Sequence, residues 1–159
     1  MQVLRNALEI KNISKHYEDF SLRNVSFSVP KGAIVGLIGE NGAGKTTTIN
    51  CILNIIRRNG GDILIWGQDN IRYEKEIKNN IGIVFDDCHF PEIFTANEIE
   101  SFMQGIYNNW EHSTYQNYLN KFNLPPKKKI KDFSRGMKVK LAFAVALSHS
   151  AKLLIGVSI

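Results

Sequence analysis

The sequence has few cysteines and no long apolar run, and both shortages narrow the possible classes of protein. Its two cysteines, Cys51 and Cys88, cannot build a disulfide framework and fit a reducing compartment. The longest apolar run, residues 141–147, is much shorter than the roughly 20 residues that cross a bilayer. The N-terminus also lacks the apolar core and cleavage site of a secretory signal. We therefore expect a single soluble intracellular domain.

A metal-ligand cluster is also missing from the sequence. The four histidines, His16, His89, His112 and His149, are scattered without the spacing of metal ligands. Each is therefore expected to be a surface or packing residue.

Positive charge is present but unevenly distributed. The net charge of the chain is +5, and residues 127–140 alone contain seven basic side chains and one acid, Asp132. The rest of the chain is nearly neutral. No aromatic residues alternate with the lysines at 127–131 to stack on bases, so a solvated loop is favoured there over a nucleic-acid patch.

Apolar periodicity predicts strands and helices that alternate after an N-terminal β segment. This order is typical of an α/β protein with a parallel sheet. A capping box, Thr95 to Glu98, opens one of the helices. The expected strands are residues 8–13, 22–29, 33–38, 62–66, 81–85 and 153–159, and the expected helices are residues 45–56, 95–107, 113–122 and 134–149.

The strongest motif is a glycine-rich loop between a predicted strand and a predicted helix. It has the P-loop spacing, in which backbone N–H groups and a lysine hold phosphates at a helix N-terminus. Lys45 would bridge the β- and γ-phosphates, and the Thr46 hydroxyl would ligate Mg²⁺. ATP and Mg²⁺ are thus the expected ligands. The loop residues are Gly39, Glu40, Asn41, Gly42, Ala43, Gly44, Lys45, Thr46 and Thr47.

With this loop, four further segments make nearly the whole chain resemble an ABC transporter nucleotide-binding domain, most like exporters of the multidrug or peptide-antibiotic branch. These are Tyr17 and residues 24–27, 81–84 and 133–137. The resemblance implies a P-loop NTPase fold with a RecA-like parallel sheet, an N-terminal antiparallel β subdomain and an α-helical signature subdomain, C-terminally incomplete. Its expected parts are residues 1–32 (β subdomain), 33–87 (P-loop core), 88–150 (helical) and 151–159 (remnant of the Walker B strand).

The resemblance also assigns roles to individual residues. Tyr17 stands where the family stacks an aromatic ring on adenine. Ser134, Arg135 and Gly136 form the signature loop, which in the family faces ATP held by a second subunit. Arg135 and Met137 depart from the commonest signature, which has glycine and glutamine there.

Asp86 follows a strand of apolar residues and can be interpreted in two ways. From the residues alone it resembles the acid of a Walker B strand, whereas the family register places it at the Q-loop glutamine. Both interpretations make it a candidate Mg²⁺ or water ligand. Nearby, Phe90, Ile93 and Phe94 are candidates for a groove that receives a membrane subunit, although apolar residues near a helix start are more often core.

The last strand lacks the acids that the resemblance leads us to expect. Gly156, Val157 and Ser158 stand where the family has an apolar residue, the Mg²⁺ aspartate and the catalytic glutamate. A positioned general base contributes about 10²–10⁴-fold to a rate. We therefore expect a chain that binds nucleotide but hydrolyses it slowly, and whose exposed strand edges favour oligomers.

Three functions remain open at this point. The first is the ATP-binding subunit of an exporter, located in the cytoplasm at the inner face of the membrane. Its expected partners are a transmembrane permease subunit and a second nucleotide-binding subunit, without nucleic acid. The second is a nucleic-acid-associated ABC protein, which usually carries tandem cassettes or insertions. The third is a non-catalytic nucleotide-binding or interaction module.

Overall fold

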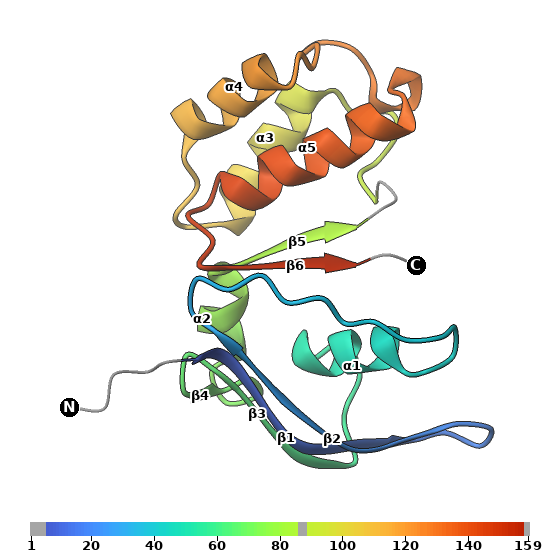
Figure 1. Ribbon diagram of the computed structural model, residues 1–159. Coiled ribbons are helices and arrows are strands. Elements are labelled where there is room, and N and C mark those ends of the chain that lie inside the picture. The colour runs from blue at the N-terminus through green and yellow to red at the C-terminus, as the bar shows by residue number, and fades with distance from the viewer. Residues whose placement is uncertain (1–5, 86–88, 158–159) are drawn as a thin grey trace. The chain divides into compact units, whose positions relative to one another are not determined.

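The protein folds into two compact units, residues 1–77 and 78–159. The computed structural model describes residues 6–85 and 89–157. The chain runs from blue through green to red in Figure 1. Each unit has its own buried side chains, so each is described separately.

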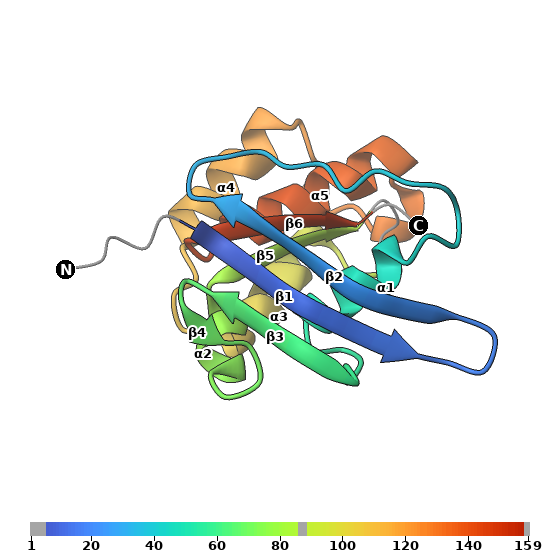
Figure 2. The same cartoon turned by 60° about the horizontal axis from the view of Figure 1, so that its bottom comes forward.

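The first unit is built on a four-stranded antiparallel sheet with the order β2-β1-β3-β4. Figure 2 shows this sheet. Its central strands bury Ile10, Ile13, Ile63 and Ile65. The strands are β1 (Asn6–His16), β2 (Ser21–Pro30), β3 (Gly60–Ile65) and β4 (Gln68–Asp69). Helix α1 (Lys45–Ile52) also belongs to this unit, and α2 (Glu74–Asn79) spans its last residues.

The predicted strand at residues 33–38 is wrong. These residues have no regular secondary structure and all are exposed, with Ile34 and Ile38 almost completely so. A strand needs a neighbour to take up its N–H and C=O groups, and no described strand pairs with this segment. Apolar composition alone therefore does not make this run a strand.

The helix predicted for residues 45–56 ends earlier, at Ile52. Leu53 is its C-cap, and Asn54 adopts a left-handed backbone with φ of 54°. A left-handed residue after the cap ends a helix, and asparagine is one of the few residues that tolerates it. Gly60 and Gly61, which follow the predicted helix in the sequence, begin β3.

The second unit consists of three helices and a two-stranded parallel sheet. Strand β5 (Ile81–Phe85) pairs in register with β6 (Leu153–Val157). The expected parallel pairing is therefore confirmed for these two strands. The helices are α3 (Ala96–Ile106), α4 (His112–Lys121) and α5 (Arg135–Leu147), with a short 3-10 turn η1 (Ile130–Asp132) before α5.

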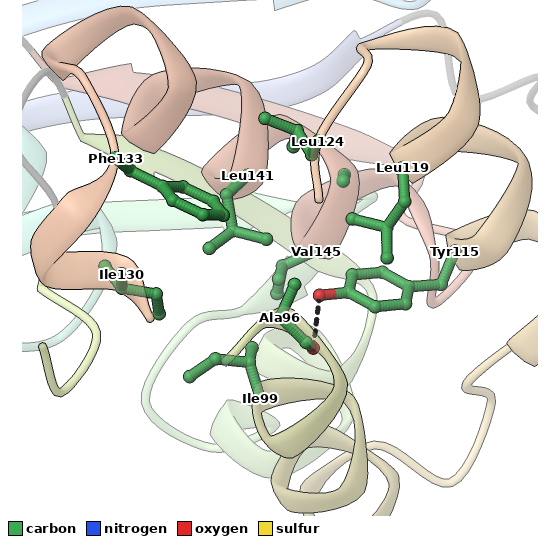
Figure 3. Packing of buried hydrophobic residues seen from close by; sticks show 10 residues of the cluster. Ala96, Ile99, Tyr115, Leu119, Leu124, Ile130, Phe133, Leu141 and Val145 are labelled. Atoms are coloured by element: carbon green, nitrogen blue, oxygen red, sulfur yellow. Dashed lines mark hydrogen bonds between the residues drawn. The ribbon is translucent and has the colours of Figure 1, made fainter. Parts of the chain in front are cut away.

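A cluster of buried side chains joins the three helices (Figure 3). At its centre the Tyr115 hydroxyl donates to the backbone oxygen of Ala96 over 2.9 Å, which ties α4 to the start of α3. Burial, with the nearby Glu100 carboxylate, raises the pKa of Tyr115, so this hydroxyl stays a donor. The capping box predicted at Thr95 and Glu98 is confirmed. Helix α2 was not predicted, because its charged sequence has no apolar period.

No helix in the described part of the chain is long and apolar enough to cross a membrane. Cys51 is a free, buried cysteine, and desolvation raises the pKa of its thiol. His149 is likewise a buried packing residue, with its ring stacked on Tyr107 at 3.9 Å between centroids. Cys88 lies outside the described residues.

We predict that the exposed run at residues 33–38 makes the isolated chain self-associate, because contiguous exposed apolar surface drives association. Light scattering of the purified chain should show dimers or larger species. The double change Ile34→Ser with Ile38→Ser should shift the distribution toward monomer. Ile55→Ser, which removes an exposed isoleucine outside the run, should leave it unchanged. A monodisperse monomer for the unaltered chain would contradict this prediction.

Candidate functional site

The glycine-rich loop before α1 has the backbone conformation of an anion-binding loop. Gly42 and Gly44 have left-handed φ angles of 83° and 92°, and the Ala43 N–H donates to the backbone oxygen of Glu40 over 3.1 Å. Left-handed residues turn successive N–H groups to one side of the chain, which makes a concave donor surface. The loop is exposed from residue 39 to residue 43.

Gly44 is also required by its neighbours on the β1–β2 hairpin. A Cβ atom added to Gly44 would lie 2.7 Å from Leu22 Cδ1 and 3.1 Å from Phe20 Cζ. A side chain at this position would have to displace the ends of those two side chains, and it would strain the backbone, whose φ of 92° favours glycine. The hairpin therefore packs directly against the point where the loop becomes α1.

Lys45 folds back over the loop that precedes it. Its Nζ donates to the backbone oxygens of Gly39, at 2.6 Å, and Glu40, at 2.7 Å. An ammonium group has three donors, so one hydrogen remains for an anion after these two bonds. The lysine thus holds a positive charge across the mouth of the loop.

The first turn of α1 supplies further donors. Among the described residues, no protein atom accepts the backbone N–H groups of residues 45–47, which lie before the first helical hydrogen bonds. The first turn of the helix contains no acidic side chain that would interact with the positive end of the helix dipole. The hydroxyl of Thr48, the residue after these three, already donates to Gly44 O over 2.8 Å and therefore has a structural role. The N–H groups, the glycines and Lys45 together fit a phosphate chain.

Thr46, the sequence candidate for a cation ligand, lies next to Lys45 at the start of α1. Its side chain is exposed in the first turn of α1, and a hydroxyl oxygen is the type of donor that Mg²⁺ accepts. The other sequence candidate, Asp86, lies outside the described residues. No cluster of three acidic, histidine or cysteine side chains suited to a metal occurs in the residues that the structure describes.

Tyr17 lies in the turn of the β1–β2 hairpin, and the same hairpin contacts the phosphate loop. The Tyr17 N–H closes the turn on Phe20 O at 2.8 Å, and the two rings are 6.4 Å apart between centroids. Phe20 in turn touches Gly44. Tyr17 is 48% exposed, and Lys15 Nζ lies 5.1 Å from the centre of its ring. An aromatic face and the anion-binding loop therefore belong to one unit.

The far end of α1 is held by a buried polar network that the sequence analysis did not identify. The Asn70 amide donates to the backbone oxygens of Cys51 and Ile52, both at 3.0 Å, and accepts from Arg58 Nη1 at 2.8 Å. Asn70 is almost fully buried. It adds a side-chain donor to two of the last carbonyl groups of α1, where helical hydrogen bonds run out. No local sequence signal marks it, because its partners lie 12 to 19 positions away.

The predicted signature loop forms the N-terminus of α5 in the second unit. Ser134 is the N-cap, and its hydroxyl accepts the Met137 N–H over 3.2 Å. Ser134, Arg135 and Gly136 are exposed. The Met137 side chain packs partly against the helix cluster. An exposed helix N-terminus with a basic first turn is suited to an anion.

The carboxyl end of β6 carries apolar groups. Gly156 and Val157 pair with Val84 and Phe85 of β5, and the Val157 side chain is only 5% exposed. An isopropyl group has no oxygen to hold a cation or a water. Ser158 lies outside the described residues.

Comparison with known proteins points in the same direction as this geometry. A sequence model of the ABC transporter family matches residues 22–156. The ABC transporter ATP-binding protein NatA of Bacillus subtilis is 30% identical over 85% of the chain and 57% of its own length. The lantibiotic transport ATP-binding protein SrtF of Streptococcus pyogenes is 32% identical over 93% of the chain and 64% of its own length.

Solved structures give the same fold. One described as an ATP-binding subunit of an ABC transporter superimposes with a TM-score of 0.83 at 28% identity, over 94% of the chain and 65% of that protein. A putative ABC transporter ATP-binding protein from Pyrococcus furiosus gives a TM-score of 0.77 at 22% identity, which is evidence for the fold alone. The chain spans less than two thirds of the length of both relatives and of the first of these structures. It spans 74% of the Pyrococcus protein.

We predict that Asn70→Ala destabilises the first unit by about 1–3 kcal/mol, because it removes the buried donors to Cys51 O and Ile52 O and one of the acceptors of Arg58. Urea unfolding followed by circular dichroism measures this loss. Asn70→Asp should also destabilise, since it keeps the acceptor for Arg58 but removes both donors. Asn108→Ala changes an exposed asparagine and should have no measurable effect. Equal stability of the Asn70→Ala variant and the unaltered chain would contradict the role given to the network.

Proposed function

The chain belongs to the ABC transporter family, and from that premise we propose that it is the ATP-binding subunit of a transporter. Its nucleotide site is the glycine-rich loop with the β1–β2 hairpin. The observation that supports this most directly is the set of unaccepted N–H groups at residues 45–47 beneath the folded Lys45. Two related proteins are named as lantibiotic and bacitracin transport ATP-binding proteins. We therefore favour export as the direction of transport.

In this proposal each group of the first unit has one task. The N–H groups of the loop and of the first turn bind phosphate oxygens, and Lys45 exchanges one of its carbonyl contacts for the β- and γ-phosphates. Tyr17 stacks on the adenine ring, which requires a planar partner rather than a specific hydrogen bond. The Thr46 hydroxyl holds the Mg²⁺ that accompanies ATP, and that ion neutralises charge on the phosphates.

The second unit contributes to a neighbouring subunit's site in this proposal. The exposed α5 N-terminus at Ser134, Arg135 and Gly136 faces ATP on a second nucleotide-binding subunit. Arg135 adds a charge where the commonest family signature has none. A permease on a separate polypeptide provides the membrane passage, which would place this chain in the cytoplasm at the inner face of the membrane. The described residues of this chain contain no helix long and apolar enough to span the membrane.

We further propose that the chain binds ATP more readily than it hydrolyses it. Val157 is buried and apolar at the position where the family resemblance expects a metal-binding acid. The loss of a carboxylate that orients water costs about 10²–10⁴-fold in rate. This property would suit a regulatory nucleotide-binding module as well as a motor subunit.

Nucleotide titration tests the site. We predict that ATP with Mg²⁺ binds the chain and that Lys45→Ala weakens this binding by at least about tenfold, since a charge-assisted contact to phosphate is lost. Tyr17→Ala should weaken binding several-fold, whereas Tyr17→Phe should not, because the ring is retained. Lys31→Ala, an exposed lysine of the same unit, serves as the control. Equal affinity of the Lys45→Ala variant would overturn the assignment of the loop.

Single-turnover hydrolysis tests the second proposal. With the chain in excess over ATP, we predict that bound nucleotide is recovered mainly as ATP over a time in which a family member that carries the Walker B aspartate and the catalytic glutamate converts it to ADP. The Lys45→Ala variant reports any contaminating ATPase. Rapid formation of ADP that disappears in this variant would show that the chain hydrolyses ATP despite Val157.

A further inference from the structure

A lysine-rich surface on the second unit has no part in the nucleotide site. We define it as the exposed side chains of Lys127, Lys128, Lys129 and Lys131 together with Ile93. We propose that this surface binds an anionic lipid bilayer directly. This proposal does not depend on ATP binding or on a permease.

Two segments form the surface by running side by side. The Ile130 N–H donates to Phe94 O over 2.9 Å, and the Lys131 N–H donates to Glu92 O over 3.0 Å. A β-bridge between Thr95 and Lys129 continues this pairing. These bonds bring Ile93 beside the lysines, although more than thirty positions separate them in the sequence.

The surface rests on a rigid base. Ile130 is completely buried in the helix cluster, and Phe133 is buried close to Leu141 (Figure 3). Phe90 and Phe94 also pack against this cluster. Ile93 alone among these apolar residues turns outward, with 68% of its surface exposed. An exposed isoleucine on an anchored backbone is an apolar contact point for a partner rather than part of the core.

The nearby acids are mostly engaged elsewhere. Glu92 is paired with Lys138 at 3.0 Å. Glu98 accepts the Thr95 N–H in the capping box, and this bond, with a smaller effect of the Lys129 charge, lowers the pKa of its carboxyl. Within the described residues, no acidic side chain lies within ion-pair distance of the four lysines. Asp132 is exposed among them. The surface therefore keeps an excess of positive charge.

The chemistry of the surface favours lipid over the other anionic partners. Lysine is depleted in protein–protein interfaces, which are enriched in aromatic residues and arginine. Single-stranded nucleic acid is held by aromatic stacking, and no aromatic residue alternates with these lysines. Anionic lipid headgroups are attracted by mobile cationic side chains without a specific geometry. A single isoleucine can insert at the boundary between the headgroups and the acyl chains.

Each lysine near an anionic leaflet contributes about fivefold to the affinity, and salt screens this attraction. Vesicle flotation measures the binding. The chain should bind vesicles of phosphatidylcholine with phosphatidylglycerol but not vesicles of phosphatidylcholine alone, without added nucleotide. Binding should fall at least about tenfold as the salt concentration rises from 50 to 300 mM, following the shorter screening length.

Two variants connect the binding to this surface. Lys127→Gln with Lys128→Gln should weaken binding to anionic vesicles by more than about tenfold, from two contributions of about fivefold. Ile93→Ser should weaken it several-fold with the charge unchanged. Lys75→Gln with Lys152→Gln removes the same charge from exposed lysines elsewhere and should retain binding. Circular dichroism checks that each variant folds.

Three results would overturn the proposal. Equal binding to neutral vesicles would assign the adsorption to exposed apolar residues such as those at 33–38. Equal losses of vesicle binding in the two lysine double variants would show that the binding depends on the net charge of the chain and not on this surface. Failure to bind anionic vesicles, with lysine-dependent binding of heparin or a short RNA instead, would assign the surface to nucleic acid. A failure of ATP binding leaves this proposal unaffected, because the lipid assay contains no nucleotide.

Discussion

The close approach of the β1–β2 hairpin to Gly44 is the constraint on which the nucleotide site depends. Leu22 and Phe20 occupy the space in which any side chain at residue 44 would lie. This contact fixes the position at which the loop turns into α1, and it brings Tyr17 to the same region. The Tyr17 ring and the glycine-rich loop are therefore related by packing within one unit.

The other end of α1 is fixed in a different way. Asn70 and Arg58 use buried hydrogen bonds to hold the helix C-terminus, where Cys51 and Ile52 present their carbonyl groups. A short helix gains little stability from its own propensity. Contacts at both ends of α1 therefore hold the helix in place. These contacts do not engage the N–H groups of its first turn as hydrogen-bond donors. The helix can then offer those donors to a ligand.

Local patterns in the sequence were sufficient for several parts of this structure. The capping box at Thr95, the strands β1, β2, β5 and β6, and the helix after Ser134 were all predicted near their observed limits. The residues of the glycine loop were identified by spacing alone. Contacts between distant positions were not predictable, and these include the packing of Leu22 on Gly44 and the network at Asn70. The run at 33–38 failed for a related reason, because strand formation depends on a neighbour that the run itself does not encode.

One contact in the second unit has a mechanical consequence. A Cβ atom on Gly82 would lie 2.7 Å from the backbone oxygen of Ala146, so β5 and α5 meet backbone to backbone. No flexible side chain separates them at this point, and close-packed interiors transmit displacement with little compression. A side chain at residue 82 would push α5 away from β5, so the smallest residue sets the spacing between this strand and this helix.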